Sequence, residues 1–395
     1  MDNLNLITQI NETLNDLFQF VDTDKFLNTD FQNYLTSSGY NSIGLNQVEH
    51  LFLPFVYENY IGEDKDSVVE LFSKNYKNPA LANSLLNAQY SIFKVKRILK
   101  NGMDLFNLLN EKDYRVFTLT KMTDFRGIGV GQFIIARIIE LQGTYFFIQI
   151  ATVISSTDED KAVDFAILSI LKNPISAYID NPEKTELIKN DISDLHKKFL
   201  DAFGSDEFLT LNTYTDDIIG GLSDSAQLQP QDYKDKAIQP DTYEFFDIDK
   251  SGIDIDSLVQ KSAVGFSSDN KTYDVGIIVD KHRGLYVVPF YQTFCKIFED
   301  KNSVVNAKKC VEFFLTNDSI PDIVLERVAK RYPNFIQVVN EFIEADYTLD
   351  SLIRHFKPLF KKYKMFSTTS VLFRSAIFEL AIAKNSDSQQ FQEVN

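Results

Sequence analysis

Residues 133–154, FIIARIIELQGTYFFIQIATVI, decide the fold class of this chain. The stretch contains two runs rich in β-branched and aromatic residues, Phe133–Leu141 and Thr144–Ile154, and Gln142-Gly143 lies between them. Runs of this composition on either side of a glycine turn are typical of two paired β-strands. The stretch therefore predicts a β-hairpin.

Strand signals continue upstream of this hairpin. Residues 90–98 and 114–119 alternate in part between apolar and polar side chains, and Asn101-Gly102 is a turn dipeptide. Glycines at alternate positions from Gly127 to Gly131 mark a loop before the hairpin. We therefore predict that residues 90–155 form about five strands of a small curled antiparallel sheet or barrel.

Most of the remaining chain has helical periodicity, with apolar residues at three- and four-residue intervals and N-capping residues before several segments. The expected fold class is therefore α+β, mainly helical. The expected organisation, in chain order, is N-terminal helices in residues 1–89, a small β module in 90–155, helices in 156–203, an acidic irregular connection in 204–272, and a helical C-terminal domain with a β-hairpin in 273–390.

The acidic connection is the most charged part of the chain. Residues 201–260 contain fourteen acidic residues and three lysines, so they carry most of the formal net charge of −16. Because few apolar groups are available to anchor it, we expect residues 204–235 to be mobile and cleaved early by proteases. We also hypothesise that this acidic region folds near the basic segment 354–366.

The composition excludes several classes of protein. The net charge of −16 disfavours binding to nucleic acid or anionic lipid unless a local basic patch overrides it. Two cysteines, Cys295 and Cys310, are too few for a multi-disulfide scaffold or a structural zinc site, so we expect buried thiols. The sequence has neither a signal-peptide pattern nor an uninterrupted apolar span. We therefore expect a cytoplasmic protein without a membrane partner.

The region from Phe52 to Phe147 resembles one found in uncharacterised bacterial proteins. The resemblance rests on FLPFVYENY (52–60), two short helices, and the β segments YSIFKVKRI, MDLFNLL, RVFTL and GQFIIARIIELQGTYFF. It implies helices followed by a small β module. Some of those proteins carry a cysteine-rich zinc tail of the SEC-C type, which this sequence lacks, so the resemblance implies no metal and no catalytic activity.

Two stretches could bind small ligands. The glycines at positions 127, 129 and 131 could form a phosphate-binding loop. A dinucleotide fingerprint, however, needs a glycine three residues after its second glycine, and Gln132 occupies that position. A β-turn with a bulge is therefore the favoured interpretation. The acidic run around residue 250 resembles the start of a calcium loop, but its twelfth position is Leu258 instead of glutamate. We favour a solvated acidic loop and no cofactor. The candidate metal ligands are Asp247, Asp249, Ser251 and Asp254.

The segment 354–366 has the most distinctive pattern, because basic and aromatic residues interleave in it. Such a segment can follow a phosphate backbone while its rings stack on bases. The favoured alternative is a helix that packs its aromatic residues in the core and points its lysines to solvent. If the segment binds nucleic acid or an acidic partner, the candidate residues are Arg354, Lys357, Lys361, Lys362 and Lys364.

No catalytic motif is recognisable, since the four histidines are scattered and paired acids are too common here to be informative. We therefore expect a binding or scaffold protein whose partner is another protein, and not an enzyme. Two alternatives stay open: a nucleic-acid-associated protein that uses residues 354–366, and an enzyme with an unrecognised site.

Overall fold

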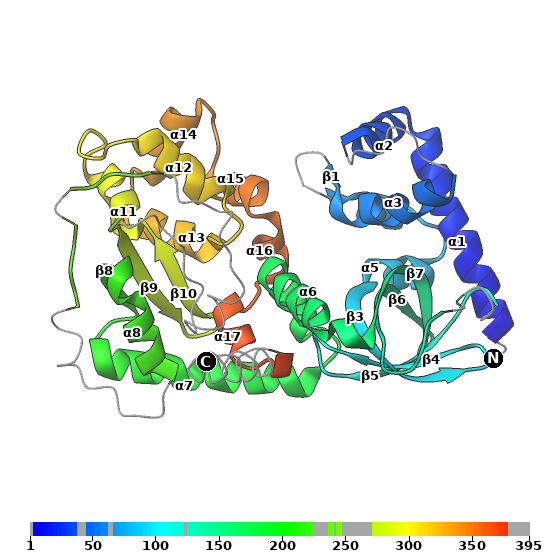
Figure 1. Ribbon diagram of the computed structural model, residues 1–395. Helices are drawn as coiled ribbons and strands as arrows, with labels where there is room; N and C mark the ends of the chain where they lie inside the picture. The colour runs from blue at the N-terminus through cyan, green and yellow to red at the C-terminus, as the bar shows by residue number, and fades with distance from the viewer. Residues whose placement is uncertain are drawn as a thin grey trace. The chain divides into compact units, whose positions relative to one another are not determined.

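The computed structural model describes residues 3–37, 45–61, 66–121, 125, 127–223, 236–240, 242–246 and 271–377. The chain divides into two compact units, Met1–Ala166 and Ile167–Asn395 (Figure 1). The fold is α+β, as the sequence predicts. Within the described residues, no helix combines the length and the apolar character that crossing a bilayer requires.

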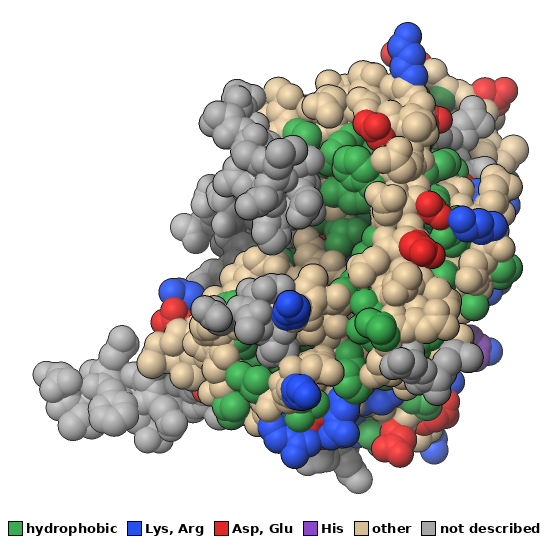
Figure 2. Space-filling view, turned by 90° about the vertical axis from the view of Figure 1, so that its right-hand side faces the viewer, with side chains coloured by type: hydrophobic (Ala, Val, Ile, Leu, Met, Phe, Trp, Pro, Cys, Tyr) green, Lys and Arg blue, Asp and Glu red, His purple; other side chains and the backbone are tan. Residues whose placement is uncertain are grey.

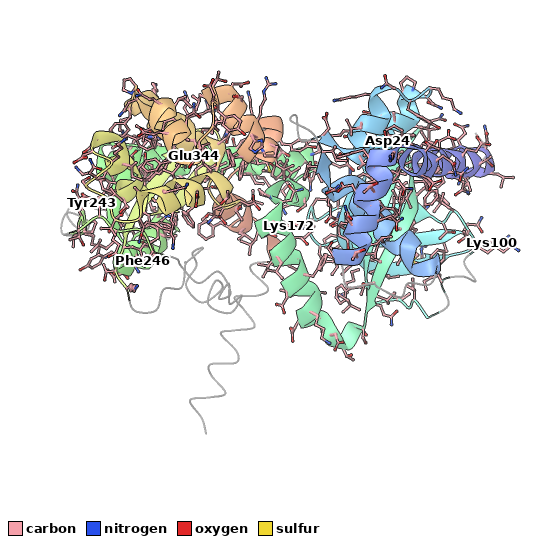
Figure 3. The ribbon with its side chains drawn as sticks, turned by 90° about the horizontal axis from the view of Figure 1, so that it is seen from above. Asp24, Lys100, Lys172, Tyr243, Phe246 and Glu344 are labelled. Carbon is pink, nitrogen blue, oxygen red and sulfur yellow. The ribbon has the colours of Figure 1, made fainter. Side chains whose placement is uncertain are left out.

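The first unit begins with a layer of helices. Along the first of them, Leu6, Ile10, Leu17 and Val21 are buried at helical spacing, which confirms the predicted apolar stripe. The Asp24 side chain accepts hydrogen bonds from the backbone at the start of the second helix, where Figure 3 labels it. The helices are α1 (Asn3–Thr23), α2 (Lys25–Ser37), α3 (Leu45–Glu58), α4 (Val68–Lys74) and α5 (Pro79–Leu86), and the strands β1 (Tyr60–Ile61) and β2 (Asp66–Ser67) lie between α3 and α4.

A closed five-stranded barrel follows these helices. Its strands are β3 (Gln89–Leu99), β4 (Gly102–Asn107), β5 (Asp113–Phe117), β6 (Phe133–Leu141) and β7 (Thr144–Ile154). Their order around the barrel is β3-β4-β5-β7-β6, and β6 closes it by pairing with β3. The prediction of about five strands in one small sheet or barrel, with a hairpin at residues 133–154, is confirmed.

The prediction that this module is antiparallel is wrong in one pairing, because β5 and β7 run parallel. Local alternation of side chains is the same in parallel and antiparallel strands. The pairing depends instead on the connection before β6, which carries the chain across the barrel so that β6 pairs with β3. The barrel is therefore mixed.

A buried arginine on β6 joins the barrel to the helices. Arg137 is 4% exposed, and its Cζ lies 4.0 Å from the ring centroid of Tyr57 in α3 and 4.8 Å from that of Tyr90 in β3. Its Nη2 lies 3.6 Å from Oε1 of Glu58. The Tyr57 hydroxyl in turn donates to the backbone oxygen of Leu85 in α5. A desolvated cation between two aromatic faces therefore holds three elements together.

The second unit contains a three-stranded antiparallel sheet of order β10-β9-β8 and a set of helices. The predicted hairpin is confirmed, and Pro358 begins a separate short helix directly after the helix that ends at Phe356. The elements are α6 (Glu159–Lys172, across the boundary between the units), α7 (Pro182–Phe203), β8 (Glu207–Leu211), α8 (Asn212–Ser223), β9 (Asp274–Asp280), β10 (Gly284–Pro289), α11 (Tyr291–Glu299), α12 (Ala307–Thr316), α13 (Asp322–Arg331), α14 (Phe335–Ile343), α15 (Leu349–Phe356), α16 (Pro358–Tyr363) and α17 (Thr368–Leu372), with short 3-10 turns at Ser156–Asp158 and Pro174–Ala177.

The assignment of residues 207–223 to an irregular connection is wrong, because they form β8 and α8. Ile218, Ile219 and Leu222 are buried in the core of the unit. The acidic residues around them concealed a short amphipathic helix, because its apolar side chains lie on one face and are few within the acidic stretch. Residues 224–235 and 247–270, with most of the acidic segment, lie outside the described residues.

Two glycines of the second unit provide a matched test of its packing. A Cβ atom added to Gly276 in the central strand would lie 2.5 Å from Cδ1 of Tyr291, which is fully buried. A Cβ atom added to Gly220 in α8 would meet no atom within 4 Å. The two sites thus differ in available space, and the same substitution should have opposite effects.

We predict that Gly276→Ala lowers the free energy of unfolding by about 1–3 kcal/mol through overpacking. Gly220→Ala should raise it by about 0.5–1 kcal/mol, because alanine is the better helix former. Urea denaturation of the full chain, followed by circular dichroism, measures both. Equal stability of Gly276→Ala and wild type would show that the packing around Tyr291 is looser than described.

Candidate functional site

Strand β3 contains a β-bulge at Lys96. Val95 pairs with Leu105 of β4, whereas Arg97 pairs with the adjacent Asp104, so Lys96 is an extra residue in β3. A bulge breaks the regular alternation of side chains and re-aims them. Lys96 and Arg97 are consequently both exposed on the outer wall of the barrel, where regular alternation would place one of them inside.

The glycine-rich loop 127–131 holds the other edge of β3 at the bulge. The Val95 N–H donates to the Gln132 oxygen and the Gly131 N–H donates to the Val95 oxygen, each at 2.8 Å. Gly131 has a φ of +86°, which favours glycine. Strand β6 follows the loop, whereas a phosphate-binding loop of the nucleotide type requires a helix there.

The bulge places Arg97 in a row of charged side chains across three strands. Arg97, Asp104 and Arg115 are neighbours on β3, β4 and β5. Arg97 Nε donates to Asp104 Oδ2 and Arg115 Nε donates to Oδ1, each at 2.8 Å. The hydrogen bonds from Arg115, and then from Arg97, hold the pKa of Asp104 below its usual range. At neutral pH the row therefore carries two positive charges and one negative charge.

A second row of side chains lies beside the first. Lys94, Phe106 and Asp113 are neighbours on the same three strands. The Lys96 Nζ atom reaches this row, at 2.9 Å from Asp113 Oδ1 and 5.9 Å from the Phe106 ring centroid. Phe106 is half-buried, whereas Lys94 and Lys96 are exposed. The Lys96 ammonium group thus lies near a partly exposed aromatic ring, whereas Lys94 Nζ lies 3.6 Å from Glu159 Oε1 and 5.3 Å from the Phe133 ring centroid.

We call these residues the basic barrel face: Lys94, Lys96, Arg97, Asp104, Phe106, Asp113 and Arg115. A hollow of about 480 Å³ lies on it, lined by both the arginine row and Lys96. Residues 89–117 contain six basic and three acidic residues, in a chain of net charge −16. In Figure 2, Lys and Arg side chains gather at the lower edge of the view, over the barrel. Lys100, in the turn after β3, projects outward (Figure 3).

The predicted basic segment 354–366 spans the end of α15, α16 and the residues after them, and its described cations Arg354 and Lys357 do not share a surface. Arg354 is exposed and pairs with Asp350 at 2.8 Å. Lys357, by contrast, is 2% exposed, and its Nζ donates to the backbone oxygen of Asn317 at 2.5 Å. Lys357 therefore supports the fold and cannot reach a partner in this structure.

Of the other predicted site residues, the structure describes the side chain of Lys364. Lys364 is exposed after α16, in the left-handed region with a φ of +46°. The side chains of Lys361 and Lys362 lie outside the described part of the structure. The predicted metal ligands Asp247, Asp249, Ser251 and Asp254 also lie outside it. Among the residues that are described, no three His, Cys, Asp or Glu side chains cluster as metal ligands.

The buried titratable groups of the second unit have structural roles. Cys295 and Cys310 are free and buried, and burial raises the pKa of Cys295 to about 12, which removes its reactivity as a thiolate. Burial also raises the pKa of Asp274. Its carboxylate accepts hydrogen bonds from the backbone of Gln292 and Thr293 and thereby caps α11.

Comparison with known proteins finds no family model, no curated protein and no solved structure that matches the chain. The resemblance of residues 52–147 to uncharacterised bacterial proteins therefore stays a prediction. The function has to be argued from the basic barrel face itself.

Sequence analysis missed the basic barrel face, although one signal for it exists. The segment Lys94-Val95-Lys96-Arg97 ends with two charged residues in succession, in a strand that alternates in part. A break of this kind is typical of a bulge. No local pattern, however, indicates that Arg97 and Arg115 share one carboxylate.

Two cations of segment 354–366 should differ greatly in their contribution to stability. We predict that Lys357→Ala lowers the free energy of unfolding by about 2–4 kcal/mol, because it opens a cavity and leaves the buried Asn317 oxygen without this donor. Arg354→Ala should cost about 0.5 kcal/mol or less, since its pair with Asp350 is exposed. Urea denaturation checks both values. Similar small costs for both variants would indicate that Lys357 is solvated.

Proposed function

We propose that this protein is a non-enzymatic binding protein and that its basic barrel face binds single-stranded nucleic acid. The observation that carries the proposal is the bulge at Lys96. It exposes both Lys96 and Arg97 on the outer face of one strand, where regular alternation would expose one of them, next to Arg115 and the half-buried ring of Phe106. Guanidinium groups recognise phosphate well, and exposed rings stack on bases without sequence preference.

The barrel topology supports the same proposal. If β3 to β7 are numbered 1 to 5 in chain order, their order around the barrel is 1-2-3-5-4, and strand 4 pairs with strand 1 to close it. Strands 3 and 5 are parallel. This is the strand order of the OB-fold, a five-stranded barrel that binds oligonucleotides and oligosaccharides on the face of its second and third strands. Those strands are β4 and β5, which carry Asp104, Phe106 and Arg115. Topology is an analogy and does not imply function by itself, so the side chains carry the argument.

The charge balance of the chain defines the kind of binding we expect. A local basic patch attracts phosphates at short range. The net charge of −16 repels them at longer range, where dissolved salt screens the repulsion. Binding should therefore be modest in affinity. It should also weaken as salt rises, because phosphate contacts release counterions from the nucleic acid.

We predict that the full chain binds a fluorescent single-stranded oligonucleotide of about 16 nucleotides at about 50 mM salt. The double variant Lys96→Glu, Arg115→Glu should weaken binding about tenfold or more, since it replaces two phosphate contacts by repulsion. Fluorescence anisotropy gives both dissociation constants. Circular dichroism establishes that the variant is folded.

The matched control is Lys189→Glu with Lys308→Glu, which makes the same change in net charge on exposed residues of the second unit. This control should bind like wild type if the effect is local to the barrel. Equal losses in the two double variants would show that only net charge matters. No binding by folded wild-type protein at low salt would refute the proposal.

A protein partner is the second candidate. The first unit exposes large apolar side chains that a protein partner could cover, among them Leu4 at 67%, Phe26 at 64% and Val130 at 64%. An acidic protein segment could use the same cations as nucleic acid does. A labelled poly-glutamate peptide in the same assay separates the two, because tighter binding of the peptide than of the oligonucleotide would favour the protein partner.

A further inference from the structure

The position of Asp104 on the basic barrel face requires an explanation. A carboxylate on the middle strand lies between two arginines, on the face that we propose to bind phosphates. The two arginine side chains are 62% and 57% exposed, and that of Asp104 is 22% exposed. The hydrogen bonds from two arginines to one carboxylate form a network that stabilises this face. The charge of Asp104 also acts on every anion that approaches the two arginines.

The hydrogen bonds show what Asp104 leaves available. Arg97 and Arg115 each donate to it through Nε and Nη2. Their Nη1 groups donate to neither of its oxygens, so both guanidinium groups are oriented while part of each remains open to a ligand. Oδ1 accepts one hydrogen bond, from Arg115, and so keeps acceptor capacity for a donor on the ligand.

We propose that Asp104 is a specificity-determining residue that favours ligands carrying hydrogen-bond donors over polyanions without them. This inference rests on the function proposed above. An ionised carboxylate repels every phosphate that approaches the two arginines. A ligand with a donor, such as a base amino group or a sugar hydroxyl, can offset that repulsion by donating to Oδ1. The internal phosphates of long-chain inorganic polyphosphate carry no such donor at neutral pH.

The role of Asp104 differs from that of the other acid on this face. Asp113 is paired with Lys96, and its side chain is 65% exposed. It lies at the edge of the face and engages a single cation of the described residues. Asp113 is therefore the matched control, because Asp113→Asn removes one negative charge from the same face without freeing the arginines.

The test uses the full chain, a single-stranded oligonucleotide and inorganic polyphosphate as probes. Asp104→Asn removes the charge and keeps the shape. We expect it to tighten polyphosphate binding about five- to tenfold, from the loss of one repulsive charge at short range. Oligonucleotide binding should tighten less, so the preference for the oligonucleotide falls. Asp113→Asn should change the two affinities by equal factors.

The salt dependence gives a second readout that a structural role for Asp104 would not change. Two freed arginines should steepen the slope of log affinity against log salt by up to about 1.4 for a single strand. An unchanged or increased preference for the oligonucleotide in Asp104→Asn would overturn the inference while leaving the proposed function intact. Failure of wild type to bind the oligonucleotide would refute the function itself.

Discussion

The β-bulge at Lys96 is the constraint on which the barrel and its basic face both depend. It allows one strand to pair with β4 on one side and with β6 and the glycine-rich loop on the other. Closing a five-stranded barrel requires strong local bending, and a bulge supplies it. The same extra residue turns Lys96 and Arg97 to the same face. The bulge therefore contributes to barrel closure, together with the register shifts between β6 and β7, and it also sets which cations of β3 face outward.

The helices of the first unit are held to this barrel by a different kind of contact. Arg137 lies buried between the rings of Tyr57 and Tyr90, close to Glu58. Burying a cation is costly unless aromatic faces or counter-charges compensate for the lost water. Here they come from α3 and β3, so the helices and the barrel must assemble together. This leaves the opposite wall, with β4 and β5, to carry the exposed cations.

The charges of the chain show why position matters more than number. Segment 354–366 has a higher density of basic residues than β3–β5, yet Lys357 lies in the core and Arg354 is paired with Asp350. The cations of the barrel come from separate strands and share carboxylates across them. Residues 207–223 show the same effect in an acidic part of the sequence. Helix α8 packs Ile218 and Leu222 in the core although the stretch around it is rich in acidic residues.

The sequence by itself determined the elements whose signals are local. Alternation and turn residues predict the strands of residues 90–154, and helical spacing with capping residues predicts most of the helices, because these patterns reflect neighbours along the chain. Only the tertiary structure decided the parallel pairing of β5 with β7 and the closure of the barrel. It alone also decided that Asp104 joins Arg97 and Arg115, and that Lys357 is buried. Each of these depends on residues that are distant in sequence, and the position of a lysine or an arginine in the chain does not specify whether its charge meets solvent, a carboxylate or a carbonyl.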